Sequence, residues 1–463
     1  MKTKKDFKKV KIHFIGIGGI GMSGIAELMF DLGYYVQGSD LQLNANTNRL
    51  KKRGITIFNG HNRKNINEVS AVVFSSAIKK NNLEILQSEK LSIPLISRAD
   101  MLGELMKHKK SIAVAGSHGK TTTTSLVGSM FDNANFDPTI VNGGIINSYS
   151  KNNRFGKGEW MIVEADESDG SFLRLPHQIN IITNIDLEHL DYYKSEKNLI
   201  LAFKDFINNL PFYGYSIICT DNINLRKLSK KIKTRKIITY SINQDSDIRV
   251  KILKRSSKNS EFSLNFKKEI IKNIKGNYNF KSNLLGDHNI LNASAAIISS
   301  LIANVPMKNI KNSLNTFMGV KRRFSFLGKI EKASIYDDYA HHPSEIKASY
   351  DIAKQISQKR IIIIFQPHRY SRTKLLIHDF IKILKNIDIL YVLDIYSAGE
   401  QPIRNINSKN LVNKINKFNK NDFDLNNNKK ISKILKKYYL ENNLIIFMGA
   451  GSITNIAHSL FDK

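Results

Sequence analysis

The sequence of 463 residues predicts an α/β protein with three domains, each built on a mainly parallel sheet. The length alone corresponds to about three domains of roughly 150 residues. Apolar runs alternate with helical patterns along the whole chain, and most of these runs end in glycine or in polar residues. Strands of parallel α/β sheets end in this way, because their ligands lie at the carboxyl ends of the strands.

The first predicted domain covers residues 1–109 and is Rossmann-like. Its expected elements are a strand at 10–16, a helix at 21–33, and strands at 34–40, 55–60, 71–77 and 93–97. The basic start followed by apolar residues is similar to a signal peptide. Four glycines at positions 16, 18, 19 and 21 suit a turn better than an apolar helix, so we expect the first strand and turn of a cytoplasmic protein.

The second and third predicted domains cover residues 110–321 and 322–463. In the second, apolar runs with polar ends begin at residues 111, 160, 179 and 215, and they are followed by a meander of short strands at 234–275 and a helix-rich stretch at 286–302. In the third, similar runs begin at residues 332, 360, 389 and 444, which predicts a second Rossmann-like α/β domain.

Composition excludes several classes of protein. The single cysteine, Cys219, leaves no internal disulfide and no cysteine metal cluster. No run of 18 apolar residues without charges occurs, so we expect no membrane insertion. The net charge of +31 would attract a polyanionic substrate. Lysine is spread along the chain rather than gathered in one helix or tail, so we expect no nucleic-acid partner.

The first glycine loop contains Gly16, Gly18 and Gly21 in the pattern G-x-G-x-x-G, with Asp40 about 20 residues further on. Glycines allow a pyrophosphate to approach the backbone, and the following helix offers unpaired N–H groups. NAD and a UDP-sugar both contain a pyrophosphate, and the loop alone does not separate them. A tight strand–helix turn without a ligand is the third interpretation.

The second glycine loop is the stretch from Gly116 to Thr121, which follows a predicted strand and opens a predicted helix. It departs from the spacing of the usual P-loop, because Val114 stands six residues before Lys120. Lys120 is still suited to the β- and γ-phosphates of ATP, and Thr121 to Mg²⁺. The middle domain is therefore predicted to be P-loop ATPase-like.

Two polar residues after later strands would complete this magnesium site. Glu164 ends one apolar run, and His189 follows another, so both are expected at adjacent strand ends beside Thr121. A lone histidine is more often a helix cap or a satisfied core residue, and the acidic run 165–169 taken alone would be a solvated loop. The nearby nucleotide loop makes us favour the metal site.

The sequence resembles the ATP-dependent Mur ligases of peptidoglycan synthesis along nearly its whole length. The motifs that carry the resemblance are GIGGIGMSGIAE, GSDL, VFSSAI, AGSHGKTTTT, VNGG, EADESDGSFL, TNIDLEHLD, LPFYG, GDHNILNASAA, GVKRRF, YDDYAHHP, FQPHRYSRT, YSAGEQPI and GAGSI. Each is weak alone, whereas the order and spacing of the set are specific. GSHGK stands where GTHGK is expected, which keeps a hydroxyl. Asp287 in GDHN is a second departure, and it is expected to weaken the electrostatics on the adenine side.

The resemblance implies a role for each of a set of residues. The UDP-sugar would contact Gly16, Gly18, Gly19, Gly21, Asp40, Ser75 and Ser76. ATP would contact Gly116, Ser117, His118, Gly119, Lys120, Thr121, Thr122, His288, Asn289, Asn292, Arg323 and Asp338. Mg²⁺ would be held by Thr121, Glu164 and His189. The amino acid would lie near Tyr339, His341, Arg369 and Arg372, and the catalytic residues would be Lys120, His341, Arg369 and Arg372.

The implied reaction joins L-alanine to the lactyl carboxylate of UDP-N-acetylmuramate through an acyl phosphate, with ADP and phosphate as products. The protein would be a monomer or a weak homodimer. A related ligase that adds a preassembled peptide is the main alternative. A folylpolyglutamate synthetase would not need the first glycine loop, and an NAD dehydrogenase would not need Lys120 and Thr121. A non-enzymatic ATP-binding scaffold or nucleic-acid binder is disfavoured by the complete catalytic set.

Overall fold

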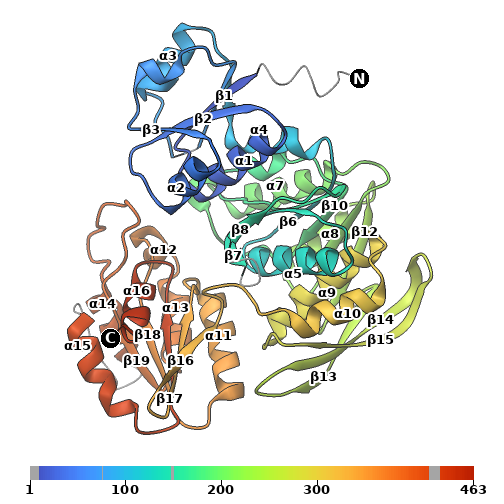
Figure 1. Cartoon of the computed structure of the whole chain (residues 1–463). Helices are drawn as coiled ribbons and strands as arrows, with labels where there is room; N and C mark the ends of the chain where they lie inside the picture. Colours follow the sequence, from blue (N-terminus) through green and yellow to red (C-terminus); the bar gives the residue numbers. More distant parts are fainter. Residues whose placement is uncertain (1–9, 76, 147–150, 417–427, 463) are drawn as a thin grey trace. The chain divides into compact units, whose positions relative to one another are not determined.

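The computed structural model describes residues 10–75, 77–146, 151–416 and 428–462. Three β-sheets connected by helices follow one another along the chain (Figure 1), which confirms the predicted three-domain α/β class. The chain divides into two compact units. One comprises residues 1–251, 264–278 and 291–314, and the other comprises residues 252–263, 279–290 and 315–463. Among the described residues, no helix has the length and apolar character that crossing a membrane requires.

Five parallel strands form the first sheet, in the order β3-β2-β1-β4-β5. They are β1 (Lys11–Ile15), β2 (Tyr35–Asp40), β3 (Thr56–Asn59), β4 (Ala71–Phe74) and β5 (Leu95–Ser97), with helices α1 (Ile20–Asp31), α2 (Ala45–Lys52), α3 (Leu83–Lys90) and α4 (Arg98–Met106) and the 3₁₀ turn η2 (Arg63–Ile66). The strand order reverses between β1 and β4. Ligands of such sheets bind where the order reverses, and Gly16 and Ser75 follow these two strands.

Ten strands form the second sheet, in the order β15-β14-β13-β12-β11-β10-β6-β9-β7-β8. They are β6 (Lys110–Ala115), β7 (Thr139–Ile146), β8 (Lys151–Arg154), β9 (Trp160–Glu164), β10 (Ile179–Ile182), β11 (Tyr215–Cys219), β12 (Lys236–Ser241), β13 (Ile248–Arg255), β14 (Ser260–Ile271) and β15 (Ile274–Ser282). The helical segments are α5 (Lys120–Asn133), η3 (Ser171–Arg174), α6 (Leu190–Tyr193), α7 (Glu196–Asn208), α8 (Ile223–Lys231), α9 (Asp287–Ile302) and α10 (Met307–Thr316). The central strand β6 pairs with β9 on one side and β10 on the other.

The strands of the meander expected at 234–275 are longer than predicted. Its strands β13, β14 and β15 have 8, 12 and 9 residues, so the prediction of short strands is wrong. Neither β13 nor β14 contains glycine or proline, so no such residue interrupts the extended backbone within either strand.

The third sheet has the order β16-β17-β20-β18-β19, with only β16 antiparallel to its neighbour. Its strands are β16 (Ser325–Ile330), β17 (Ala333–Asp338), β18 (Ile361–Phe365), β19 (Ile389–Val392) and β20 (Leu444–Met448). The helical segments are α11 (Pro343–Ile356), α12 (Tyr370–Leu375), α13 (Ile377–Leu384), α14 (Ser408–Asn416), α15 (Asn428–Leu435), η4 (Lys436–Tyr438) and α16 (Ile453–Ser459). Successive residues of β18 and β20 join two separate hydrophobic clusters, as expected for strands covered on both faces.

Candidate active site

The second glycine loop has a backbone that requires glycine at two positions. Gly116 has a φ of 129°, and a Cβ atom there would lie 2.2 Å from Thr183 Oγ1. Gly119 has a φ of 83°, and a Cβ atom there would lie 2.5 Å from Asn292 Oδ1. Gly119 caps α5 without a side-chain hydrogen bond, so the first N–H groups of this helix are available to an anion.

Lys120 is the first residue of α5 and forms an ion pair inside the loop. Its Nζ lies 2.9 Å and 2.8 Å from the two carboxylate oxygens of Glu167, and it donates to the carbonyl of Gly116 at 2.6 Å. Burial alone would lower the pKa of Lys120, but the nearby carboxylates, above all Glu167, outweigh it and raise this pKa. The ammonium therefore stays charged and suited to a phosphate.

Glu167 is a residue of the site that the sequence did not reveal. The acidic run 165–169, taken alone, suggested a solvated loop, whereas Glu167 is 1% exposed. Burial raises the pKa of Glu167, while Lys120 acts in the opposite direction. One feature of the sequence could have indicated that Glu167 belongs to the site. Glu167 stands three residues after Glu164, in an acidic run that directly follows a buried strand.

Thr121 and Glu164 form one half of the expected metal site. Thr121 Oγ1 donates to Glu164 Oε1 at 3.2 Å, and the other carboxylate oxygen accepts from the backbone of Gly143 at 2.8 Å. This pair lies at the carboxyl end of β9, beside the loop that follows β6. A hydroxyl and a carboxylate are oxygen donors of the kind that Mg²⁺ prefers. The next residue, Thr122, is buried in the first turn of α5.

His189 belongs to a second group of possible metal ligands. Its Nε2 lies 3.7 Å from Glu167 Oε1 and 4.0 Å from Glu188 Oε2, and one ligand atom from each of the three residues lies within 4.8 Å of the others. Two carboxylates and an imidazole fit a divalent cation. The expectation of adjacent strand ends is wrong in one respect, because the strands before Glu164 and His189 lie on opposite sides of β6.

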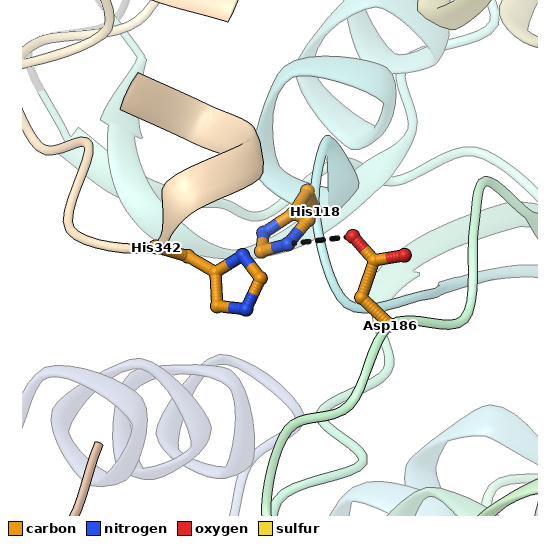
Figure 2. Close-up of side chains that lie close together, drawn as sticks. All are labelled: His118, Asp186 and His342. Carbon is orange, nitrogen blue, oxygen red and sulfur yellow. Dashed lines mark ion pairs between the residues drawn. The ribbon is translucent and has the colours of Figure 1, made fainter. Parts of the chain in front are cut away.

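A second loop, residues 183–186, braces the glycine loop. Asn184 Oδ1 accepts from the backbone of His118 at 2.8 Å, and Ser117 Oγ accepts from the backbone of Asp186 at 2.9 Å. The His118 ring forms an ion pair with Asp186, with 3.2 Å between Nε2 and Oδ2 (Figure 2). The hydroxyl of Ser117 thus has a structural partner, which a threonine hydroxyl could also supply. The predicted contacts of Ser117 and His118 with ATP stay predictions.

The first glycine loop is held by side chains from the end of β2 and from α2. Gly16 has a φ of 76°, and Gly19 caps α1. The backbone N–H of Gly18 donates to Asp40 Oδ2 at 2.8 Å, and its carbonyl accepts from Asn46 at 2.9 Å. The predicted role of Asp40 beside the uridine stays a prediction, since the structure shows this carboxylate positioning the loop.

Ser75 lies next to this loop, as the sequence predicts. Its Oγ would be 4.0 Å from a Cβ atom on Gly16, and it accepts from the backbone of Ala77. Ser76, the other serine assigned to the sugar nucleotide, lies outside the described residues.

A cavity of about 220 Å³ extends between the first turn of α1 and the part of the second sheet that contains Glu164. Gly21 and Arg98 line it from the first domain, and Asn142, Gly143 and Glu164 line it from the second. Both domains belong to the same compact unit over this region. The cavity therefore connects the first glycine loop with Glu164.

Helix α9 carries the three residues expected near adenine. Asn292 lies against the glycine loop, as its closeness to Gly119 shows. Asn289 Nδ2 donates to the carbonyl of Leu285 at 2.8 Å, at the start of its own helix. His288, in the first turn of the same helix, is exposed. Their contact with adenine stays a prediction.

The partner of Asp287 is Arg255. The guanidinium binds both carboxylate oxygens at 2.9 Å. Both side chains are about half exposed, so the pair is solvated. The expectation that Asp287 weakens the electrostatics of the adenine site thus needs revision, because Arg255 offsets its charge.

Asp338, Arg323 and Tyr339 form a cluster at the end of β17. Burial raises the pKa of Asp338 to about 6, although Ser349 donates a hydrogen bond to it. The Arg323 guanidinium lies 5.2 Å from the centre of the Tyr339 ring and 3.4 Å from Glu345. The contact of Arg323 and Asp338 with ATP stays a prediction.

Three of the residues assigned to the amino acid, His341, Arg369 and Arg372, lie close to His368. The rings of His341 and His368 are 5.6 Å apart, and Arg372 Nη1 lies 3.2 Å from His368 Nδ1. Burial, with the charges nearby, lowers the pKa of His368 to about 4. Arg369 has a φ of 70° and donates to Glu400 at 2.6 Å. Arg369 directly precedes α12, whereas Arg372 lies within this helix.

His341 and His342 are adjacent in the chain but have different partners. His341 Nδ1 lies 2.9 Å from the carbonyl of Tyr339, and the ring packs edge-on against that tyrosine. His342 instead caps α11, where it forms a capping box with Glu345.

Comparisons with known proteins agree with this architecture. Residues 11–110 match the model of the Mur ligase family, catalytic domain, residues 114–300 that of the Mur ligase middle domain, and residues 322–451 that of the Mur ligase, glutamate ligase domain. The UDP-N-acetylmuramate–L-alanine ligase of Rickettsia felis is 48% identical over 470 residues, which cover 98% of each chain. The enzyme of the same name from Rickettsia massiliae is 49% identical over 459 residues, covering 97% of this chain and 94% of the relative.

A solved structure shares the fold over nearly the whole chain. The UDP-N-acetylmuramate-alanine ligase of Thermotoga maritima is 28% identical, with a TM-score of 0.79 and 98% of each chain covered. A murein peptide ligase from Psychrobacter arcticus has a TM-score of 0.68 at 22% identity and also covers 98% of each chain, which shows the shared fold alone. The three family matches follow the order of the three sheets, and this chain belongs to the Mur ligase family.

Proposed function

We propose that this chain joins L-alanine to the lactyl carboxylate of UDP-N-acetylmuramate in an ATP-dependent reaction of peptidoglycan precursor synthesis, giving ADP and phosphate. The observation that supports it most directly is the cavity between the first glycine loop and Glu164, since Gly21 and Glu164 both line it. Two relatives that are 48% and 49% identical, over 98% and 97% of this chain, are named UDP-N-acetylmuramate–L-alanine ligase.

In the first step, the lactyl carboxylate attacks the γ-phosphate of ATP, the bond to the bridging oxygen breaks, and an acyl phosphate and ADP form. Two anions must meet, so positive charge lowers the barrier. Lys120 supplies one charge, and it would exchange its contact with Glu167 for the phosphates. Mg²⁺, when bound, would add charge at the same place. Thr121, Glu164 and His189 would hold it, together with Glu167 and Glu188.

In the second step, the amine of L-alanine attacks the acyl phosphate carbonyl, and phosphate leaves. The amine must be neutral, and His341 would accept its proton. If Nδ1 of His341 donates to the carbonyl of Tyr339, Nε2 is left as the basic nitrogen. Arg369 and Arg372 would orient a carboxylate, with Glu400 released from Arg369 when the amino acid binds.

Each domain would have one main task. Residues 1–109 would bind the UDP-sugar, residues 110–321 would bind ATP, and residues 322–463 would bring in the amino acid and close over the nucleotide. The reaction would take place in the cytoplasm, by a monomer or weak homodimer, without nucleic acid or membrane insertion.

The proposal is tested by phosphate release from ATP and Mg²⁺ with UDP-N-acetylmuramate and one amino acid at a time. Release that requires both the sugar nucleotide and L-alanine is the expected result. Release with a tripeptide instead would favour the alternative, a related ligase that adds a preassembled peptide. No release with any pair of substrates would contradict the ligase activity.

A further inference from the structure

Arg98 lies between the first glycine loop and Glu164. It is the first residue of α4, directly after the capping residue Ser97. Its Nη1 would lie 2.6 Å from a Cβ atom on Gly21, so the guanidinium covers the first turn of α1 at a residue without a side chain. The same arginine lines the 220 Å³ cavity that Glu164 and Asp166 enter from the second domain.

Within the described part of the chain, the Arg98 guanidinium has no hydrogen bond or ion pair. The nearby carboxylate of Asp100 already has other partners, because it forms an ion pair with Arg174 at 2.9 Å and accepts a hydrogen bond from Ser97 at 2.6 Å. Arg98 is only partly exposed. A guanidinium that has lost part of its water and has gained no partner is suited to an anionic ligand, which it can bind through two parallel hydrogen bonds.

A sugar nucleotide with a lactyl group has two anionic parts that reach this region. The diphosphate has the N–H groups of the first glycine loop and of α1. The lactyl carboxylate must enter a cavity whose other charged lining residues are the acids Glu164 and Asp166. These acids repel it, and Arg98 is the basic residue that lines the same cavity.

We infer that Arg98 binds the lactyl carboxylate of the sugar nucleotide and so distinguishes an acidic sugar nucleotide from its neutral counterpart. The inference rests on the proposed function and identifies a specificity residue within it. Arg98 would hold the carboxylate between the first glycine loop and Glu164, which is the place where the phosphoryl transfer requires it.

The test compares two sugar nucleotides by calorimetric titration of the full chain without ATP. UDP-N-acetylmuramate has the lactyl carboxylate, and UDP-N-acetylglucosamine lacks it but keeps the diphosphate. For Arg98→Gln we expect the affinity for the first to fall about 10- to 100-fold, the range for loss of a hydrogen-bonded charge. The affinity for the second should stay within about twofold. Arg98→Lys, which keeps the charge but loses the planar fork, should fall in between.

Arg174→Gln is the matched control. Arg174 lies near the same end of α4 but pairs with Asp100 and is more than half exposed, so its loss should change neither affinity. Melting temperatures of all variants exclude unfolding as the cause. Equal losses for both nucleotides in Arg98→Gln would overturn the inference, because the arginine would then serve the diphosphate. Unchanged affinities would overturn it as well. If the unaltered protein bound neither nucleotide, the proposed function itself would fail.

Discussion

Glu84→Gln tests a buried polar network that joins four elements of the first domain. Glu84 is fully buried near the start of α3. Its carboxylate lies 2.5 Å from Ser39 Oγ, 2.7 Å from Asn65 Nδ2 and 3.4 Å from His13 Nε2. His61, after β3, lies 3.1 Å away. Glutamine keeps the shape of the side chain and removes its charge.

The size of the effect follows from the pKa of Glu84. Burial alone would raise it, but hydrogen bonds and charge from His13, with bonds from Ser39 and Asn65, lower this pKa from 4.5 to about 2. At roughly 1.4 kcal/mol per pH unit, the ionised carboxylate contributes about 3 kcal/mol to the stability of the folded domain at pH 7. A carboxylate with a lowered pKa contributes fully above pH 4.5, and the contribution is lost as the pH falls through about 2.

Hydrogen exchange followed by mass spectrometry measures this effect in the first domain alone. Amides of β1 and β2 should exchange about 100-fold faster in Glu84→Gln at pH 7, and the difference should shrink as the pH falls from 4.5 toward 2. Glu89→Gln is the matched control, because Glu89 is exposed on the same helix. A change of less than about 1 kcal/mol at pH 7, or a difference that does not depend on pH, would refute the reasoning.

Three further predictions concern the other two domains. Lys120→Ala should lower ATP-dependent phosphate release at least about 100-fold while UDP-N-acetylmuramate still binds in calorimetry, because the loop loses its only lysine; surviving turnover would contradict the assignment of this loop. Asp338→Asn should raise the melting temperature of the third domain at pH 7.5 but not at pH 4, since a carboxylate with its pKa raised from 3.8 to about 6 destabilises the fold only where it is ionised; an equal effect at both pH values would argue against burial as the cause. Cys219 should resist alkylation by iodoacetamide at pH 8 in the folded protein, because burial raises the pKa of its thiol to about 12; rapid labelling measured by mass would show that the thiol is accessible.

Local patterns in the sequence were sufficient for the sheets and for both glycine loops. The apolar runs at 361–365 and 444–448 are the fully buried strands of the third sheet, and a run of that length and composition has few other ways to be buried. The glycines at 116 and 119 adopt conformations that other residues rarely adopt. Such conformational preferences depend on a few neighbouring residues, so they can be predicted from the sequence without the tertiary structure.

The ion-pair partners of the charged residues could not be predicted from such local patterns. Lys120 binds Glu167, 47 positions away, and Arg255 binds Asp287, 32 positions away. The error about the strand ends of Glu164 and His189 has the same origin, because the order of strands in a sheet is not the order in the sequence.

Some features of this protein depend on local interactions in the chain, and others depend on contacts between distant segments. Backbone conformation and amphipathic periodicity are set by interactions within a few residues, and the sequence states them directly. The charge state of Lys120, the buried carboxylate of Glu84 and the surroundings of the Arg98 guanidinium depend on groups that distant strands and helices bring near them. Electrostatic energies vary steeply with distance and burial, and only the tertiary structure decides both.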